Sequence, residues 1–201
     1  MDNPSRRQIL AMGAAGVALT ATSGTAAETR FDRASPALVA RARVAMAKHK
    51  SRIRFTDRIA VADFSQPSRQ PRFFVIDMAN GQMASHLVAH GRGSDPSHTG
   101  WLSRFSNVPG SLASSDGAYL TGEIYHGVHG RAMRLAGLDS VNCNAEARAI
   151  VIHAAWYVSP QLAREKGRIG RSEGCFALTD QSLNSVLAEL GPGRLLYADK
   201  V

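Results

Sequence analysis

The chain has 201 residues, of which 44% are hydrophobic and 20% are charged. This balance excludes an intrinsically disordered chain and allows one domain with a substantial core. The net charge of +8 favours an anionic partner or environment, such as nucleic acid, a membrane surface or an acidic cell-wall polymer.

The first residues have the organisation of an export signal. Arg6 and Arg7 directly precede an apolar stretch rich in Ala and Gly, and small side chains at Thr25 and Ala27 offer a cleavage site. Paired arginines at this place are typical of a twin-arginine signal; an ordinary secretory signal and an uncleaved anchor are the alternatives. The apolar stretch is shorter than the roughly 20 residues of a transmembrane helix. We therefore expect residues 1–27 to direct export and to leave no membrane span behind.

A helix is predicted next, within a helical extension over residues 28–57. Ser35 is a common helix cap and Pro36 is favoured in the first turn. Apolar side chains then recur with helical spacing at Leu38, Val39, Ala42, Ala45 and Met46. We expect this helix to pack on the outside of the main domain.

Short strands dominate residues 58–201. Ile59–Phe64 is an apolar run, and Arg72–Met78 pairs with Met83–His90 around the turn at Asn80-Gly81. Further strands are predicted at Ala118–Tyr125, Arg131–Leu135, Ala149–His153 and Arg194–Tyr197.

One C-terminal helix is predicted over Asp180–Leu190. Thr179 or Asp180 caps it, and Gly191-Pro192-Gly193 ends it. Many short strands with Gly, Pro and Asn between them predict a mainly β domain, a sandwich or a barrel, with a short N-terminal helix and one C-terminal helix.

Two cysteines allow two interpretations. Cys143 and Cys175 could form a disulfide in an oxidising compartment. Alternatively, Cys143 is a free thiol in a polar turn, and Cys175, between Gly174 and an apolar run, is a nucleophile. A thiolate attacks a carbonyl when an imidazole manages the proton, and His153 ends a predicted strand where it can do so.

The sequence around Cys175 resembles the L,D-transpeptidase (YkuD-type) family. His153, a loop, and then Ser172-Glu173-Gly174-Cys175 is similar to the catalytic signature of that family. The resemblance extends from about Arg72 to Tyr197. Segments similar to the murein L,D-transpeptidase catalytic-domain branch are His90–Asp95, Phe105–Ser111, Leu120–Gly127 and Gly170–Leu178.

This resemblance implies peptidoglycan chemistry in an exported bacterial protein of the periplasm or cell envelope. The thiol attacks the carbonyl that joins an L-centred residue of a stem peptide to D-alanine, D-alanine leaves, and a thioester remains. An amine of a neighbouring stem peptide then forms a cross-link, or water trims the stem. No metal and no organic cofactor is implied.

The resemblance also implies residue roles. Cys175 is the nucleophile, His153 moves the proton, and the backbone carbonyl of Ala154 orients the imidazole. The backbone N–H groups of Glu173, Gly174 and Cys175 are the candidate oxyanion hole. Gly174 would allow a close backbone approach.

Two positions depart from the family pattern. Glu173 stands where many relatives carry His, and Phe176-Ala177 replaces a Val/Ile-Arg pair. Arg171 could supply the missing positive charge. Because a carboxylate beside the thiol would raise the pKa of Cys175, we expect Glu173 to point away from it or to pair with Arg171. The candidate substrate contacts are Ser172, Arg171, His126, Trp156 and Tyr157.

Three of these contacts have a plainer alternative. Ser172 can hold the loop through its hydroxyl, and Trp156 and Tyr157 can fill core instead of lining the site. His126 and His129 resemble a metal-binding pair, but no further ligands complete a site, so no metal is expected.

Other functions fit the same residues. An L,D-carboxypeptidase would form the same thioester with water as the acceptor. A non-catalytic cell-wall-binding protein would use only the fold and the positive charge. A nucleic-acid-binding module is disfavoured by the export signal and by basic residues that lack interleaved aromatic side chains.

Overall fold

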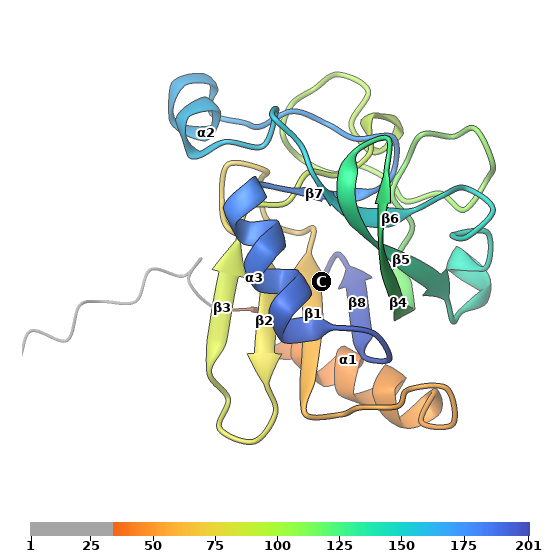
Figure 1. The fold of residues 1–201 in the computed structure, drawn as a ribbon. Helices are drawn as coiled ribbons and strands as arrows, with labels where there is room; N and C mark the ends of the chain where they lie inside the picture. The colour runs from red at the N-terminus through yellow and green to blue at the C-terminus, as the bar shows by residue number, and fades with distance from the viewer. Residues whose placement is uncertain (1–33) are drawn as a thin grey trace, which may run out of the picture.

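The computed structural model describes residues 34–201, which form an eight-stranded mixed sheet with helices on both of its faces (Figure 1). The strand order is β3-β2-β1-β8-β4-β5-β6-β7. The elements in chain order are α1 (Pro36–Lys48), β1 (Arg58–Asp63), β2 (Phe73–Asp77), β3 (Met83–His86), η1 (Arg92–Ser94), β4 (Gly117–Gly127), β5 (Gly130–Gly137), η2 (Ser140–Asn142), β6 (Val151–Ala154), α2 (Pro160–Lys166), β7 (Phe176–Leu178), α3 (Asp180–Leu190) and β8 (Leu195–Asp199).

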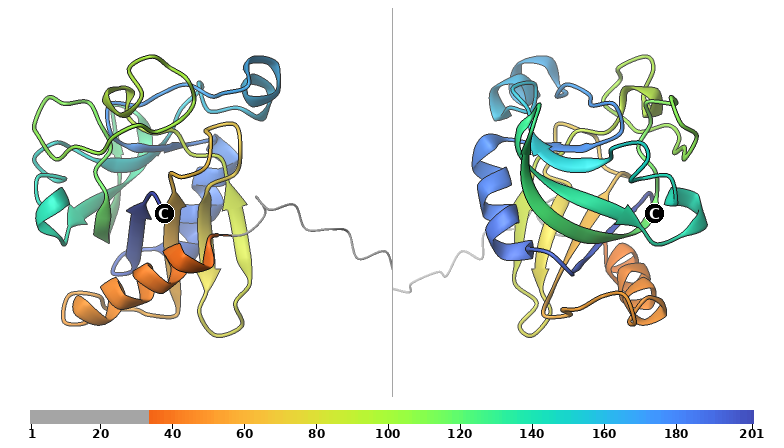
Figure 2. Two further views of the ribbon diagram at one scale, coloured as in Figure 1. Left: turned by 180° about the vertical axis from the view of Figure 1, so that it is seen from behind. Right: turned by 45° about the vertical axis from the view of Figure 1, so that its right-hand side comes forward.

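The central strands are buried on both faces, which explains why they are continuously apolar in sequence. Successive side chains of a strand point to opposite faces. In β1, Ala60 and Ala62 therefore join the larger core under α3, whereas Ile59 and Val61 join a second core under α1. Figure 2 shows α1 and α3 on opposite sides of this part of the sheet.

The predicted mainly β fold class with its two terminal helices is confirmed. The C-terminal helix has the predicted bounds, and Thr179 caps it, because its hydroxyl oxygen accepts a hydrogen bond of 3.0 Å from the N–H of Ser182. The N-terminal helix packs against the sheet through Leu38, Ala42 and Ala45.

One predicted strand is shorter in the structure, and two observed elements were not predicted. The strand predicted over Met83–His90 ends at His86, and Ala89 instead forms an isolated bridge with Ala177. Helix α2 and strand β7 were not predicted. The signals for α2 were present, because the Ser159 hydroxyl caps it and Gly167 ends it with a left-handed backbone.

Strands β6 and β7 pair in parallel at one edge of the sheet, with His153 opposite Ala177. Cys175 directly precedes β7 and lies two residues before Ala177. Because side chains alternate along a strand, this register directs His153 and Cys175 towards the same side of the sheet. The missed strand β7 is thus the element that brings the two residues together.

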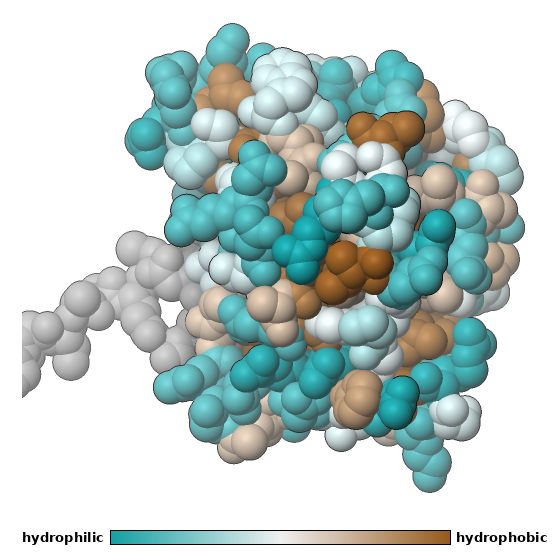
Figure 3. Space-filling view, in the orientation of Figure 1, coloured by the Kyte–Doolittle hydropathy of each residue, from teal (hydrophilic) through white to brown (hydrophobic). Residues whose placement is uncertain are grey.

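On the face drawn in Figure 3, hydrophilic side chains cover most of the area around small apolar patches. Within residues 34–201, no helix combines the length and the apolar composition needed to cross a bilayer. The predicted export signal, residues 1–27, lies outside the described residues.

Candidate active site

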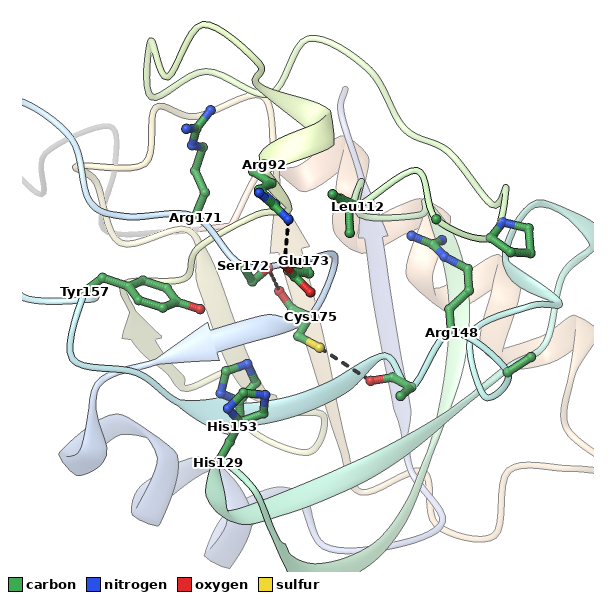
Figure 4. Close-up of a pocket in the computed structure, with 14 residues that line it drawn as sticks. Arg92, Leu112, His129, Arg148, His153, Tyr157, Arg171, Ser172, Glu173 and Cys175 are labelled. Atoms are coloured by element: carbon green, nitrogen blue, oxygen red, sulfur yellow. Dashed lines mark hydrogen bonds and ion pairs between the residues drawn. The ribbon is translucent and has the colours of Figure 1, made fainter.

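A cavity of about 590 Å³ lies beside β6 and the turn that precedes β7, and both Cys175 and His153 line it (Figure 4). The thiol of Cys175 donates to the carbonyl oxygen of Ala149 at 3.5 Å. Both cysteines are free. Cys143 is exposed elsewhere, where the side-chain amide of Asn107 donates to its sulfur at 3.2 Å. The disulfide interpretation is therefore excluded.

His153 is buried, and its orientation is fixed by the main chain. Its Nδ1 lies 2.8 Å from the carbonyl oxygen of Ala154. Because a carbonyl oxygen only accepts hydrogen bonds, Nδ1 carries the proton and Nε2 keeps its lone pair. An imidazole in this tautomer can accept a proton at Nε2.

The surroundings disfavour charge on both groups. Burial lowers the pKa of His153; the Ala154 carbonyl opposes this shift and His129 adds to it. Burial also raises the pKa of Cys175, and the backbone of Val151 and the guanidinium of Arg148 act in the opposite direction. The resting pair is therefore a neutral thiol and a neutral imidazole.

The turn before Cys175 is closed by Ser172. The Ser172 hydroxyl donates to the carbonyl oxygen of Cys175 at 2.7 Å and accepts from the N–H of Gly174 at 3.2 Å. The hydroxyl is thus engaged within the turn, although Ser172 borders the cavity. Because the Gly174 N–H is also engaged, the N–H groups of Glu173 and Cys175 remain as candidate oxyanion donors.

Gly174 occupies a position that a side chain would not fit. Its φ is +121°, and a Cβ atom there would lie 2.7 Å from Cδ1 of Ile150 and 2.8 Å from the carbonyl oxygen of Ala113. Gly174 therefore lies against these neighbouring segments in a backbone conformation that favours glycine. Gly91 meets the same turn from the other side, where a Cβ atom would lie 2.8 Å from the Cα of Gly174.

The segment around Gly91 clamps the turn by main-chain bonds. The N–H of Ser172 donates to the carbonyl of His90 at 2.9 Å, and the N–H of Arg92 donates to the carbonyl of Ser172 at 2.7 Å. His90 is held in turn by the fully buried Arg72. Its Nη2 donates to the carbonyl of Val88 at 3.0 Å and lies 2.7 Å from Nδ1 of His90. This network holds the turn before Cys175 against the sheet.

Glu173 pairs with Arg92 rather than with Arg171. Nη2 of Arg92 lies 2.7 Å from Oε1 of Glu173. The guanidinium of Arg171 instead donates to the carbonyl oxygens of Asp95 and Pro96. Of the two alternatives for Glu173, the pair with Arg171 is wrong, because the Asp95–Pro96 loop takes up the Arg171 donors. Arg171 still lines the cavity.

Arg148 is a cavity residue that sequence reasoning missed. Its Nη1 donates to the Ser106 carbonyl and to the Ser115 hydroxyl, each at 2.7 Å, and its Nη2 donates to the Ala113 carbonyl. The next residue, Ala149, has a left-handed backbone with φ of 52°. No local pattern identifies such a residue, because its partners lie more than thirty positions away in the sequence.

Arg92 and His129 also line the cavity and were not predicted as site residues. Of the predicted substrate contacts, Tyr157 lines the cavity, whereas His126 and Trp156 do not. Trp156 is 86% exposed and packs edge-on against Tyr157. Within residues 34–201, no group of three or more His, Cys, Asp or Glu side chains is arranged to hold a metal ion.

A thiol and an oriented neutral imidazole in one cavity are the arrangement that cysteine-dependent acyl transfer requires. Residues 18–198 match the family model described as the L,D-transpeptidase catalytic domain. The chain therefore belongs to the L,D-transpeptidase family. A search of curated proteins gives no match.

Solved structures similar to the chain include three with TM-scores of 0.44. An L,D-transpeptidase from Mycobacterium smegmatis is 12% identical and is matched over 71% of this chain and 58% of that chain. L,D-transpeptidase 3 from Mycobacterium tuberculosis is 13% identical, with 72% and 60% covered. The helical cell shape determining protein Pgp2 from Campylobacter jejuni is 12% identical, with 71% and 47% covered. The chain thus spans less than two thirds of each, and the family assignment rests on the family model.

Proposed function

We propose that this protein is an exported peptidoglycan L,D-transpeptidase in which Cys175 is the nucleophile. The observation that carries the proposal is the shared cavity of Cys175 and His153, with Nδ1 of His153 bound to the Ala154 carbonyl. Membership of the L,D-transpeptidase family supplies the substrate class, the stem peptides of peptidoglycan.

The proposed acylation begins with proton transfer from Sγ of Cys175 to Nε2 of His153. The sulfur forms a bond to the carbonyl carbon that precedes D-alanine, and the N–H groups of Glu173 and Cys175 donate to the resulting oxyanion. The carbon–nitrogen bond then breaks, and the imidazolium returns its proton to the amine of the departing D-alanine. A thioester on Cys175 remains.

The second half of the reaction reverses these roles. The amine of a second stem peptide attacks the thioester, and His153 accepts its proton. The carbon–sulfur bond breaks, the thiolate is protonated again, and a new amide links the two stems. The energy of the original peptide bond is kept in the thioester, so no nucleotide is consumed.

The charges around the cavity fit an anionic donor peptide. Arg92, Arg148 and Arg171 line it, and Glu173 is the carboxylate among the lining residues. We propose that Arg171 attracts a carboxylate of the donor stem, because it lines the cavity and its guanidinium donates there to neutral carbonyl oxygens, which leave its positive charge uncompensated by them.

The products formed from purified tetrapeptide muropeptides test this function. Cross-linked dimers would support transfer, and tripeptide monomers alone would show that water is the acceptor, as in an L,D-carboxypeptidase. Cys175→Ala should abolish both products, and Cys143→Ser should retain them, because Cys143 lies outside the cavity. Binding to the wall without turnover would leave only a non-catalytic wall-binding role.

We further propose that residues 1–27 direct export, by the twin-arginine route, to the bacterial periplasm or cell envelope. The support is the arginine pair at positions 6 and 7 before an apolar stretch. Replacing both arginines by Lys should leave the protein in the cytoplasmic fraction. Unchanged export of that variant would argue for an ordinary secretory signal.

A further inference from the structure

His129 lies in the turn between β4 and β5, yet its ring contacts the candidate base. The ring centroids of His129 and His153 are 4.4 Å apart, with an angle of 22° between the planes (Figure 4). This is a stacked arrangement of two imidazoles that belong to different elements. His129 also lines the cavity that holds Cys175.

The sheet register makes this contact a fixed feature. β5 pairs with β6 so that Ala132 lies opposite His153. The hairpin turn is only three residues before Ala132 and bends at Gly130, whose φ is +75°. His129 therefore reaches over the end of β6 on a short, hydrogen-bonded hairpin.

We propose that His129 is a positioning residue for His153, which holds the imidazole plane by stacking and, when it carries a proton, keeps His153 neutral. The inference rests on the proposed function, because it assigns the neutral form of His153 as the base. Stacking restricts rotation out of the plane, and the bond from Nδ1 to the Ala154 carbonyl restricts rotation within it. Nε2 is then kept in one direction.

The charge effect follows from elementary electrostatics. Two stacked imidazolium ions repel each other, so a proton on one ring disfavours a proton on the other. Burial is the larger cause of the low pKa of His153, and His129 adds to it. The neighbouring strands present the uncharged residues Ala132 and Ala177 opposite His153. The other titratable groups that line the cavity are Arg92, Arg148, Tyr157, Arg171, Glu173 and Cys175.

Three variants separate the effect of the His129 charge from the effect of its ring and from a general disturbance of the β4–β5 hairpin. His129→Gln removes both the charge and the ring, and His129→Lys removes the ring but keeps a positive charge, so the difference between them reports the charge. Val128→Ala changes a neighbouring side chain that is 97% exposed. The first readout is the pKa of His153 from an NMR titration of histidine-labelled protein. It does not depend on any enzymatic activity.

We expect His129→Gln to raise the pKa of His153 by about 0.5 unit, and we expect His129→Lys and Val128→Ala not to raise it. At a pH well below the pKa of His153, a shift of that size lowers the fraction of neutral His153 about threefold. An unchanged pKa in His129→Gln, or an equal rise in Val128→Ala, would overturn the charge role.

By analogy with the family, we expect carbapenem-type β-lactams to acylate Cys175, with the thiol opening the lactam ring. The second readout is the rate of this acylation, followed by intact mass between pH 5 and pH 8. The acid limb of the pH–rate profile should move to higher pH in His129→Gln but not in His129→Lys. The maximal rate should fall in both variants, because neither keeps the ring that holds His153. A wild-type maximal rate in His129→Lys would remove the ring role. If the wild-type protein forms no adduct at all, the proposed function fails, while the titration still decides whether His129 acts on His153.

Discussion

The burial of Cys175 and the charges near it determine how much of its thiol is ionised before substrate binds. Burial raises the pKa of the thiol, and Arg148 is the nearby cation that lowers it. The thiolate is therefore scarce at neutral pH, so the proposed acylation depends on proton transfer from Cys175 to His153. Glu173 would raise the pKa further, and its ion pair with Arg92 places a positive charge beside that carboxylate.

Substituting Arg148 tests this balance. In a Cys143→Ser background, we expect Arg148→Gln to shift the pH midpoint of Cys175 alkylation upward, because a charge that favours the thiolate is lost. Arg148→Lys keeps the charge and should shift the midpoint less. The measurement is the rate of iodoacetamide labelling as a function of pH. Equal midpoints in the Cys143→Ser protein with and without Arg148→Gln would show that Arg148 only holds the 106–115 loop in place.

Gly174 offers a second test at the scale of one residue. Gly174→Ala would place a Cβ atom 2.8 Å from the Ala113 carbonyl oxygen, in a backbone with φ of +121°. We expect a loss of about 2–4 kcal/mol in the free energy of unfolding, from strain plus overpacking. Carbapenem acylation should also be lost.

Gly81→Ala is the matched control, since Gly81 also has a positive φ but a Cβ atom there would have nothing within 4 Å of it. This variant should cost only about 1 kcal/mol of strain and leave acylation intact. Urea denaturation measures the stability of both variants. If the two variants lose equal stability, the close approach at Gly174 is unimportant.

At the scale of elements, α1 supplies the apolar face that covers one side of the sheet. Leu38 and Ala42 are fully buried in the same core as Val61 and Leu195, from β1 and β8. The helix also makes ion pairs to the sheet side, with Arg41 at 2.6 Å from Asp199 and Lys48 at 2.6 Å from Asp139. These exposed pairs contribute little compared with the buried contacts.

We therefore expect Leu38→Ala to lower the free energy of unfolding by about 2–5 kcal/mol, because it leaves a cavity between α1 and the sheet. Val44 lies on the same helix and is 70% exposed, so Val44→Ala should change stability by less than about 0.5 kcal/mol. Chemical denaturation of the two variants makes the comparison. A neutral Leu38→Ala variant would mean that α1 is dispensable for the fold.

The predictability of these elements depended on whether their signals are local. Helix α3 was predicted at its observed bounds because its cap, its apolar spacing and its terminating Gly191 are adjacent in the sequence. Strand β7 has only three residues and directly follows Cys175. It is recognisable as a strand only through its pairing with β6, which no local pattern shows. Strand β3 is shorter than predicted because the chain leaves its partner β2 after His86, and Ala89 instead pairs with Ala177 of β7.

The same distinction applies to the site when the whole molecule is considered. Cys175 and His153 can be identified from the sequence because their neighbours carry a signal. Gly174 and an apolar run flank Cys175, and an apolar predicted strand ends at His153. Arg92, Arg148 and His129 reach the cavity from three other segments, and only the folded sheet brings them there. His126 shares a hairpin with His129 and was the residue singled out, but the cavity contains His129 instead.

The final prediction concerns the charge of the whole molecule. The net charge is +8, and loss of residues 1–27 would remove two arginines and one aspartate, so most of this charge would remain. Stem peptides carry free carboxylates, so long-range attraction should strengthen association with isolated cell-wall sacculi. The Debye length falls from about 10 Å at 0.1 M salt to about 3 Å at 1 M salt.

We therefore expect sacculus binding by the Cys175→Ala variant to weaken severalfold between these two salt concentrations. Cosedimentation measures the bound fraction, and that variant prevents turnover from altering the wall during the assay. Thermal unfolding at both concentrations is the control, because a salt-induced loss of structure would also release the protein. Binding that is insensitive to salt, with the fold intact, would show that contacts inside the cavity, rather than the basic surface, hold the protein on the wall.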